Sequence, residues 1–354
     1  MWTQRRRGAQ AALLLMVLFG AGCDNQHLDK AGGSAPEKPL VLRLAAHDDD
    51  YAYGTFAAAV ARLSAGSMRI SVVPNWRVTG DRREIDYEVG TVSDVRRGRV
   101  PLGIVGVRVW DMLGVDSFQG LLAPFLVDTL ALERRALASP LARRALASVE
   151  RKGVIGIALL PGRLRRPLGI TRPLIRPQDY HDAMIGVRPG DVAKATFDAL
   201  GARAKGYVPV ELSGFDGVEL DPLTITENNL DVEARALTAN IVLWPKAQTV
   251  VMNRAAFRAL SPDRRKILED AGREAVAPEL ARIARDQLFG LKTLCGYGGV
   301  RLASARPADL AALRRAVQPV YAGLEDDPLT KQWIDSILSF RAESPTPPDT
   351  LRCP

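Results

Sequence analysis

The sequence has few of the residues from which catalytic and metal sites are usually built. Its 354 residues include three histidines, His27, His47 and His181, and their separations match no metal-binding motif. It contains no C-x-x-C pair, no G-x-S-x-G elbow, no P-loop and no G-x-G-x-x-G opening a helix. Carboxylates are abundant, but no pair stands out by its position. These absences favour a binding protein over an enzyme, and they predict no cofactor.

Long apolar runs are also scarce, and the only candidate lies at the N-terminus. Arg5–Arg7 precede an apolar stretch over 11–19, which is too short to span a membrane as a mature helix. Small residues then lead directly to Cys23, as in a lipobox, although Gly20 stands where an aliphatic residue is usual. We therefore expect a signal segment over 1–23, lipidation of Cys23 and a flexible tether over 24–39. The alternative is a cleaved and soluble form.

The charge of the chain is only mildly positive. The formal net charge of +8 includes Arg5–Arg7, and it falls to about +5 once the signal segment is removed. An excess of this size, spread along the chain, does not indicate nucleic-acid binding. It fits an anionic small ligand or an anionic membrane surface. With 47% hydrophobic residues, the rest of the chain predicts a globular body of two domains.

Cysteine is rare, and an exported protein meets an oxidising compartment. After Cys23, only Cys295 and Cys353 remain. Cys353 lies in a proline-rich tail over 343–354 that has little means of docking itself. We therefore predict a disulfide between Cys295 and Cys353 that ties the tail to the body, with two free thiols as the alternative.

Hydrophobic periodicity predicts alternating strands and helices. Strands are expected over 40–45, 68–73 and 102–107, separated by helices that end near Gly66 and Val95. This alternation favours a mostly parallel sheet covered by helices. Further helices are expected over 130–150, 191–200, 261–291, 307–324 and 333–340, the third of them kinked or split at Pro278. Further strands are expected over 153–160, 185–187, 240–243 and 249–252, and near 207–210.

The stretch from Gly162 to Trp244 organises the rest of the chain. At its centre, the short β-branched strand ends at Arg188, and Pro189-Gly190 turns into the next helix. The carboxyl ends of strands are where ligands bind in open α/β sheets, and a helix N-terminus offers free N–H groups to an anion. A guanidinium there can hold a carboxylate through two parallel hydrogen bonds.

Several short segments around Arg188 occur in a familiar order. They are Pro177-Gln178-Asp179-Tyr180 before Gly186-Val187-Arg188, then Phe215-Asp216-Gly217-Val218-Glu219, Leu243-Trp244-Pro245 and Val250-Val251-Met252-Asn253. In this order, the chain resembles the solute-binding subunit of TRAP (tripartite ATP-independent periplasmic) transporters, of the C4-dicarboxylate-binding type. The resemblance covers about residues 40–324.

The resemblance implies a two-lobe α/β clamp of the periplasmic-binding-protein type II, with a long helical segment spanning the lobes. Lobe I is expected over 40–161 and about 247–290, and lobe II over 162–246 and about 291–342. The implied function is to capture a small organic acid outside the cytoplasm and to deliver it to the membrane permease subunits of the transporter. A sensor or receptor subunit of the same fold is the alternative, and an enzyme on this scaffold is a weaker one. The identity of the acid, and whether a metal bridges it to the protein, stay open.

The resemblance also assigns ligand-binding residues in lobe II. The carboxylate-gripping arginine is Arg188. A second arginine falls among Arg163, Arg165 and Arg166, with Arg165 favoured. The other lobe II candidates are Asp216, Glu219, Asp221 and Trp244. Asp221 stands where the family often has an amide, and an acid there would repel a second ligand carboxylate. Ordinary roles remain open: Trp244 as a core aromatic, and Asp216 and Glu219 as turn or capping residues.

In lobe I, the candidates are Asp48, Tyr53 and Arg108, which follow strand ends. Because loops at strand ends are usually polar, these three rest on position alone.

Overall fold

The computed structural model describes residues 38–47, 52–77, 87–207, 212–345 and 347–354. The expected signal segment, most of the tether, Cys23 and Asp48 lie outside these ranges. Lys38–Pro354 form one compact unit. Within the described ranges, no helix is long and apolar enough to cross a membrane.

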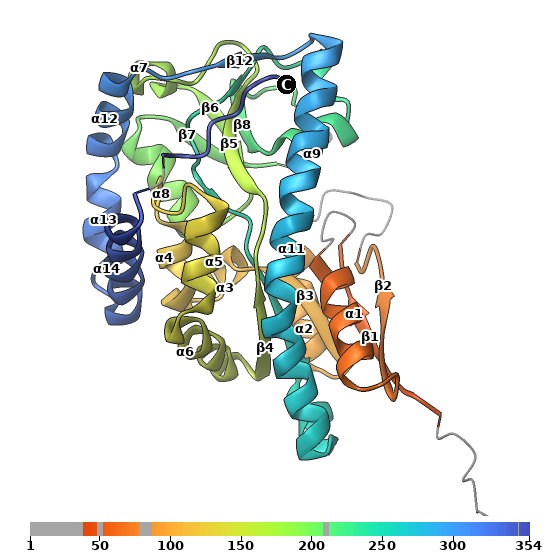
Figure 1. Ribbon diagram of the computed structural model, residues 1–354. Coiled ribbons are helices and arrows are strands. Elements are labelled where there is room, and N and C mark those ends of the chain that lie inside the picture. Colours follow the sequence, from red (N-terminus) through yellow and green to blue (C-terminus); the bar gives the residue numbers. More distant parts are fainter. Residues whose placement is uncertain (1–37, 48–51, 78–86, 208–211, 346) are drawn as a thin grey trace, which may run out of the picture. The chain divides into compact units, whose positions relative to one another are not determined.

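The first sheet contains five strands in the order β2-β1-β3-β11-β4 (Figure 1). β1 (Leu40–Ala45) pairs in parallel with β2 (Met68–Val73) and β3 (Leu102–Gly106), as the strand and helix alternation predicts. β11 (Gln248–Asn253) lies antiparallel to both β3 and β4 (Val154–Leu160). Because β11 enters this sheet from the second one, no crossover helix fixes its direction.

The second sheet has the order β12-β9-β5-β8-β6-β7, with β10 paired to β5. Here β6 is parallel to β7 and β8, whereas β5 is antiparallel to β8, β9 and β10. The expected two-sheet α/β fold is therefore confirmed, and the sheets are mixed because the strands that enter from the other sheet run antiparallel. The bounds are β5 (Leu164–Gly169), β6 (Met184–Val187), β7 (Arg203–Gly206), β8 (Gly217–Leu220), β9 (Ala236–Thr238), β10 (Trp244–Pro245) and β12 (Arg301–Ala303).

Helices flank both sheets. Those that precede β4 or follow β11 are α1 (Ala52–Leu63), α2 (Tyr87–Arg96), α3 (Arg108–Met112), α4 (Gln119–Leu122), α5 (Leu130–Ala138), α6 (Pro140–Ser148) and α10 (Arg254–Ala259). Those associated with the second sheet are α7 (Pro177–Tyr180), α8 (Asp191–Ala199), α9 (Pro222–Glu227), α12 (Pro307–Ala316) and α13 (Gln318–Leu324). Single 3₁₀ turns lie at Asp116–Phe118, Val149–Lys152 and Leu230–Val232.

The chain passes between the two sheets twice at one place. It leaves the first sheet between β4 and β5, and it returns between β10 and β11. The two passing segments are hydrogen-bonded, with Lys246 N donating to Arg163 O at 2.9 Å. A Cβ atom at Gly162 would lie 1.7 Å from Lys246 O. Glycine is therefore required at this crossing, because any side chain would force the two segments apart.

A third connection is α11 (Pro262–Tyr297), a helix of 36 residues. It contacts α1, β4 and α5 along one part and α9 along another (Figure 1). Ser261 accepts a hydrogen bond from Arg264 N, and Pro262 occupies the first turn, as expected. Pro278 does not split the helix. One lost hydrogen bond is outweighed by the packing of a long buried face on both sides of Pro278.

Some expected elements have other bounds. The helical region over 130–150 is two helices, since Pro140 excludes Ser139 from the helical region and starts α6. The region over 307–324 is likewise divided between α12 and α13, with a proline in the first turn of α13. Residues 240–243 join no strand ladder and lie between β9 and β10. The strand expected near 207–210 lies at 203–206, and 208–211 are outside the described residues.

The C-terminal region packs back on earlier parts of the chain. α14 (Pro328–Glu343) contacts α4, α5 and α6, although its residues fall mostly within the expected lobe II. Trp333 is fully buried there and donates from Nε1 to Ser117 O. Beyond α14, the expected disulfide joins Cys295 to Cys353, with their Cα atoms 5.8 Å apart. Leu351 is buried in the core beside the second sheet, so the tail is docked as well as tethered.

Glu133 of α5 makes the crossing sensitive to pH. Its side chain is fully buried, and Oε1 accepts a hydrogen bond from Gly162 N at 2.8 Å. Burial, with a smaller effect of the nearby Glu279, raises the pKa of Glu133 to about 8. The folded protein therefore retains a proton that the unfolded chain releases above its ordinary pKa of 4.5.

We predict that this group lowers the free energy of unfolding as the pH rises from about 5 to 8, by up to about 1.4 kcal/mol per pH unit. Urea unfolding of the wild type and of Glu133→Gln across this range measures it. The glutamine keeps the hydrogen bond to Gly162 and cannot ionise. As the pH rises, the free energy of unfolding of the wild type should therefore fall steadily relative to that of the variant. A constant difference would contradict a buried, protonated Glu133.

Candidate ligand-binding site

Arg188 directly follows β6, and its surroundings hold it in place. β6 lies parallel to β8, which brings Arg188 beside Glu219. The backbone N of Arg188 donates to Glu219 Oε1 at 3.3 Å. Its side chain is buried, and its guanidinium lies over the ring of Tyr87, with Cζ 5.6 Å from the centroid. The aromatic ring of α2, which packs on the first sheet, thus lies against this cation.

Arg165 of β5 approaches the same point from the other side of β8, the strand that lies between β5 and β6. Its Nη1 donates to Asp221 Oδ2 at 3.1 Å, and its Nε lies 3.6 Å from Glu219 Oε2. Both carboxylates are buried, so three buried charged side chains form one network. Trp244 of β10 pairs with Arg165 across the ladder and packs edge-on against Phe197 of α8. The indole therefore forms an apolar wall next to the arginines.

The first lobe contributes α3, which begins where β3 ends. Arg108 forms an ion pair with the buried Glu88, and its Nη1 donates to Pro189 O at 3.1 Å. Asp111, one turn along, accepts a hydrogen bond from Val192 N at 2.9 Å. Arg108 thus contacts the turn that follows Arg188, and Asp111 contacts the first turn of α8.

Asp111 also completes the N-terminus of α8. The N-cap of this helix is Gly190, which has no side chain to accept a hydrogen bond. The Asp111 carboxylate, from another element, takes that role. Burial raises the pKa of Asp111, opposed by hydrogen bonds from Val192 and Gln119.

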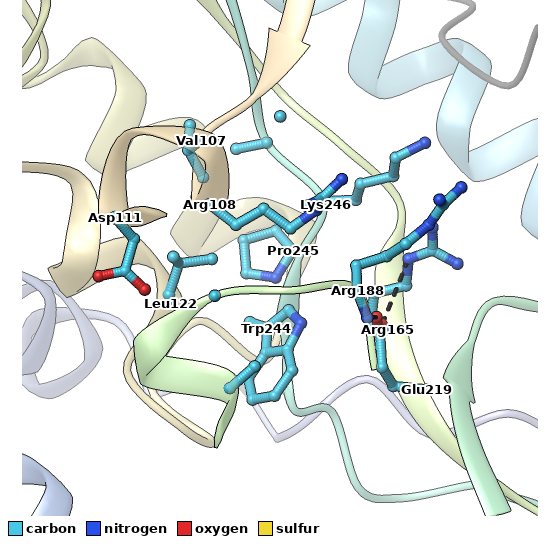
Figure 2. A pocket seen from close by; sticks show the side chains of 14 residues that line it. Val107, Arg108, Asp111, Leu122, Arg165, Arg188, Glu219, Trp244, Pro245 and Lys246 are labelled. Atoms are coloured by element: carbon cyan, nitrogen blue, oxygen red, sulfur yellow. Dashed lines mark hydrogen bonds and ion pairs between the residues drawn. The ribbon is translucent and has the colours of Figure 1, made fainter. Parts of the chain in front are cut away.

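A small cavity lies between these groups, with a volume of about 30 Å³. Figure 2 shows Arg165, Arg188 and Glu219 on one side of it and Asp111 and Leu122 on the other. Its charged lining residues are four cations and two acids: Arg108, Arg165, Arg188, Lys246, Asp111 and Glu219. The excess of cations favours an anion. In this conformation, the volume holds only one or two water molecules.

The residues predicted from the sequence fall into two groups. Arg108, Arg165, Arg188, Glu219 and Trp244 line the cavity together. Tyr53, Asp216 and Asp221 do not.

The second group has other partners. Asp221 caps α9 through Thr224 and pairs with Arg165 behind the cavity. Asp216 accepts hydrogen bonds from Thr171 and Met184 N, and Tyr53 packs against the core of the first sheet. In this conformation, these three side chains support the fold.

The three arginines at 163, 165 and 166 contact different parts of the structure. Only Arg165 lines the cavity. Arg163 pairs with Asp286 of α11 at 3.4 Å. The fully buried Arg166 donates to Ala239 O and to Asp349 of the tail, and burial lowers its pKa to about 10.

Two lining residues with charged side chains were not predicted: Asp111 and Lys246. Asp111 follows Arg108 by three residues, a spacing that places both on one helix face. Lys246 follows Trp244-Pro245 directly. No local motif marks either, since their roles arise where segments distant in sequence meet. Among the described residues, no group of His, Cys, Asp and Glu is arranged to hold a metal ion.

A larger groove, of about 780 Å³, lies elsewhere. It is formed only by first-lobe helices, β4 and α11, and has a mostly apolar floor. Its charged side chains are Arg134, Arg143, Arg273, Glu150 and Glu269. Its positive and negative charges nearly balance, and it has no buried arginines like those of the small cavity. The small cavity is therefore the better candidate for an anion-binding site.

Comparison with known proteins identifies the same family that the sequence resembles. Residues 49–327 match the family described as bacterial extracellular solute-binding protein, family 7. The C4-dicarboxylate-binding periplasmic protein DctP of Shewanella loihica is 22% identical over 293 residues, 77% of this chain and 80% of that protein.

Solved structures share the fold. A TRAP periplasmic solute-binding protein from Shewanella oneidensis with bound succinate matches with a TM-score of 0.72 and 20% identity, over 85% of this chain and 99% of that one. A second TRAP periplasmic solute-binding protein, from Polaromonas and bound to D-erythronate, matches with a TM-score of 0.71 and 17% identity. The match covers 84% of this chain and 98% of that one.

We predict that Asp111→Ala lowers the free energy of unfolding by about 0.5–2 kcal/mol, because the N-terminus of α8 loses its acceptor. Asp111→Asn keeps an acceptor oxygen and should lose less. Urea unfolding of the three proteins at one pH measures the effect. Equal stability of the alanine variant and the wild type would show that this contact does not hold the lobes together in solution.

Proposed function

Because this chain belongs to family 7 of the bacterial extracellular solute-binding proteins, we propose that it captures a small organic acid between two lobes and delivers it to the permease subunits of a TRAP transporter. The observation that carries this proposal is the pair of buried arginines, Arg165 and Arg188, at the strand ends of the second sheet. Two guanidiniums at one cavity are suited to a carboxylate, which they can hold with parallel hydrogen bonds.

The lobes proposed for this clamp follow the two sheets. Lobe I is 40–161 with about 247–290, and lobe II is 162–246 with about 291–342. The crossing at Gly162 and Lys246 supports this division, because the chain changes sheets there in both directions. The contacts of α14 with α4, α5 and α6 would let that helix brace lobe I against lobe II.

Closure would couple to the ligand through α3. When a carboxylate neutralises the arginines of lobe II, the lobes can approach, and Arg108 and Asp111 then reach Pro189 O and Val192 N. Removing water strengthens the charge-assisted bonds between ligand and protein. A hinge whose two states differ by a few kcal/mol is biased by such a gain.

The ligands named for relatives give two chemical types, a simple dicarboxylate and a hydroxy acid. Both carry a carboxylate that Arg188 would grip, with Arg165 beside it. Trp244 would contribute an apolar face to the carbon skeleton.

We also propose that residues 1–23 direct export and that Cys23 carries a lipid, with 24–39 as a tether. The support is the sequence pattern of basic residues, apolar core and small residues before the cysteine. A lipid anchor would keep the clamp beside its membrane partner and raise its local concentration there.

We predict that Arg188→Ala weakens binding of the acid by about 2–5 kcal/mol, roughly 30-fold to several thousand-fold, because the ligand carboxylate loses its buried partner. A thermal-shift panel of small organic acids, with neutral sugars as controls, first identifies a ligand. Isothermal titration then compares wild type and variant. Arg203→Ala, an exposed arginine in the same sheet, is the matched control and should bind normally. An unchanged dissociation constant for Arg188→Ala would refute the anchor.

We predict that Cys23→Ser moves the protein from the membrane fraction to the soluble extracytoplasmic fraction, because serine cannot accept the lipid thioether. Cell fractionation followed by detergent partitioning measures this. A wild-type protein that is already soluble would refute the anchor and leave the clamp unaffected.

A further inference from the structure

Glu219 is a buried carboxylate that the carboxylate-binding role does not by itself require. Its side chain is about 3% exposed, and it lines the cavity between Arg165 and Arg188. Oε1 accepts the hydrogen bond from Arg188 N. Oε2 has no hydrogen-bond partner among the described residues, and Arg165 Nε lies 3.6 Å away from it.

The groups around Glu219 leave this oxygen to the cavity. Tyr207 Oη donates to the backbone carbonyl of Glu219 and not to its carboxylate. The other nearby carboxylate, Asp221, is turned away and receives hydrogen bonds from Thr224 and Arg165. A buried acceptor without a donor carries a substantial desolvation penalty, which a ligand donor can remove.

Glu219 also penalises the wrong ligand. A carboxylate held by Arg165 and Arg188 lies near the Glu219 carboxylate, and two like charges at short range repel in a dry site. A ligand hydroxyl or ammonium on the carbon next to its carboxylate would reach Oε2 and offset this repulsion. A simple alkanoate has no such group.

We propose that Glu219 is a specificity-determining residue, and that this site selects acids bearing a hydrogen-bond donor, a hydroxyl or an ammonium, beside the carboxylate. The inference rests on the proposed function and names the ligand class of the same cavity. The chemistry shared by the two donor types is an X–H group directed at Oε2.

The test uses ligands that differ only in the donor. Isothermal titration of the wild type compares propionate, lactate and alanine, which share a three-carbon skeleton, and the four-carbon pair succinate and malate. We expect the donor-bearing member of at least one set to bind about 10- to 100-fold more tightly than its matched acid.

Glu219→Gln separates the role of the residue from the rest of the site. It keeps the size of the side chain and an oxygen for Arg188 N, and it replaces the charged acceptor. The preference for the donor-bearing acid should fall to about threefold or less, with the largest loss for an ammonium. Glu233→Gln, at an exposed position of the same lobe, is the control and should keep the wild-type preference.

Each outcome decides a separate claim. Equal affinity of the wild type for matched acids with and without the donor overturns this inference and leaves the carboxylate clamp standing. An undiminished preference in Glu219→Gln overturns the assignment to Glu219. Failure of every carboxylate to bind overturns the proposed function, and this inference with it. If the variant does not fold, the wild-type comparison alone decides the ligand class.

Discussion

The binding site depends on a buried network of oppositely charged side chains in the second sheet. Arg165 pairs with Asp221 at 3.1 Å and with Glu219 at 3.6 Å, and all three are buried. Removing one member would leave an uncompensated buried charge, at a cost of about 3–5 kcal/mol. The network therefore fixes the strand ends as a rigid wall. Arg188 is attached to that wall through its backbone N, and its guanidinium lies over the ring of Tyr87.

The first sheet and its helices meet this wall through polar and apolar contacts, and several of the polar ones lie close to the crossing. Val107 N donates to Ala247 O, where the chain re-enters the first sheet. Arg108 and Asp111 follow and reach the turn after Arg188. Apolar packing joins the two sheets as well, because one buried hydrophobic cluster contains Val105 and Trp110 on the side of the first sheet and Val187 and Trp244 on the side of the second. The conformation described here is therefore held by apolar burial as well as by polar contacts.

Three arginines close together in the sequence have different roles because of where they lie at β5. They are Arg163, Arg165 and Arg166. Successive residues of a strand face opposite sides, so Arg165 faces the cavity and Arg166 the other side. There, Asp349 of the disulfide-tied tail neutralises Arg166. Arg163 precedes the strand and forms an ion pair with Asp286 of α11. The tail thus compensates a buried charge one residue from the site, which is a structural reason for tying it down.

The sequence alone determined the alternating strands and helices from β1 to β3, the strand-to-helix junction that presents Arg188, and the cysteine pair, because periodicity, turn residues and residue type are local properties. It also indicated five of the residues that line the cavity. It did not predict β5, β8, β9 or β12. Arg165 was favoured over Arg163 and Arg166 only through the family resemblance, and Asp111 and Lys246 were missed. Those outcomes depend on strand register, on the direction of β5 and β11, and on contacts between segments about 80 residues apart, such as Asp111 with Val192. Only the packing of the two sheets around one crossing decides them.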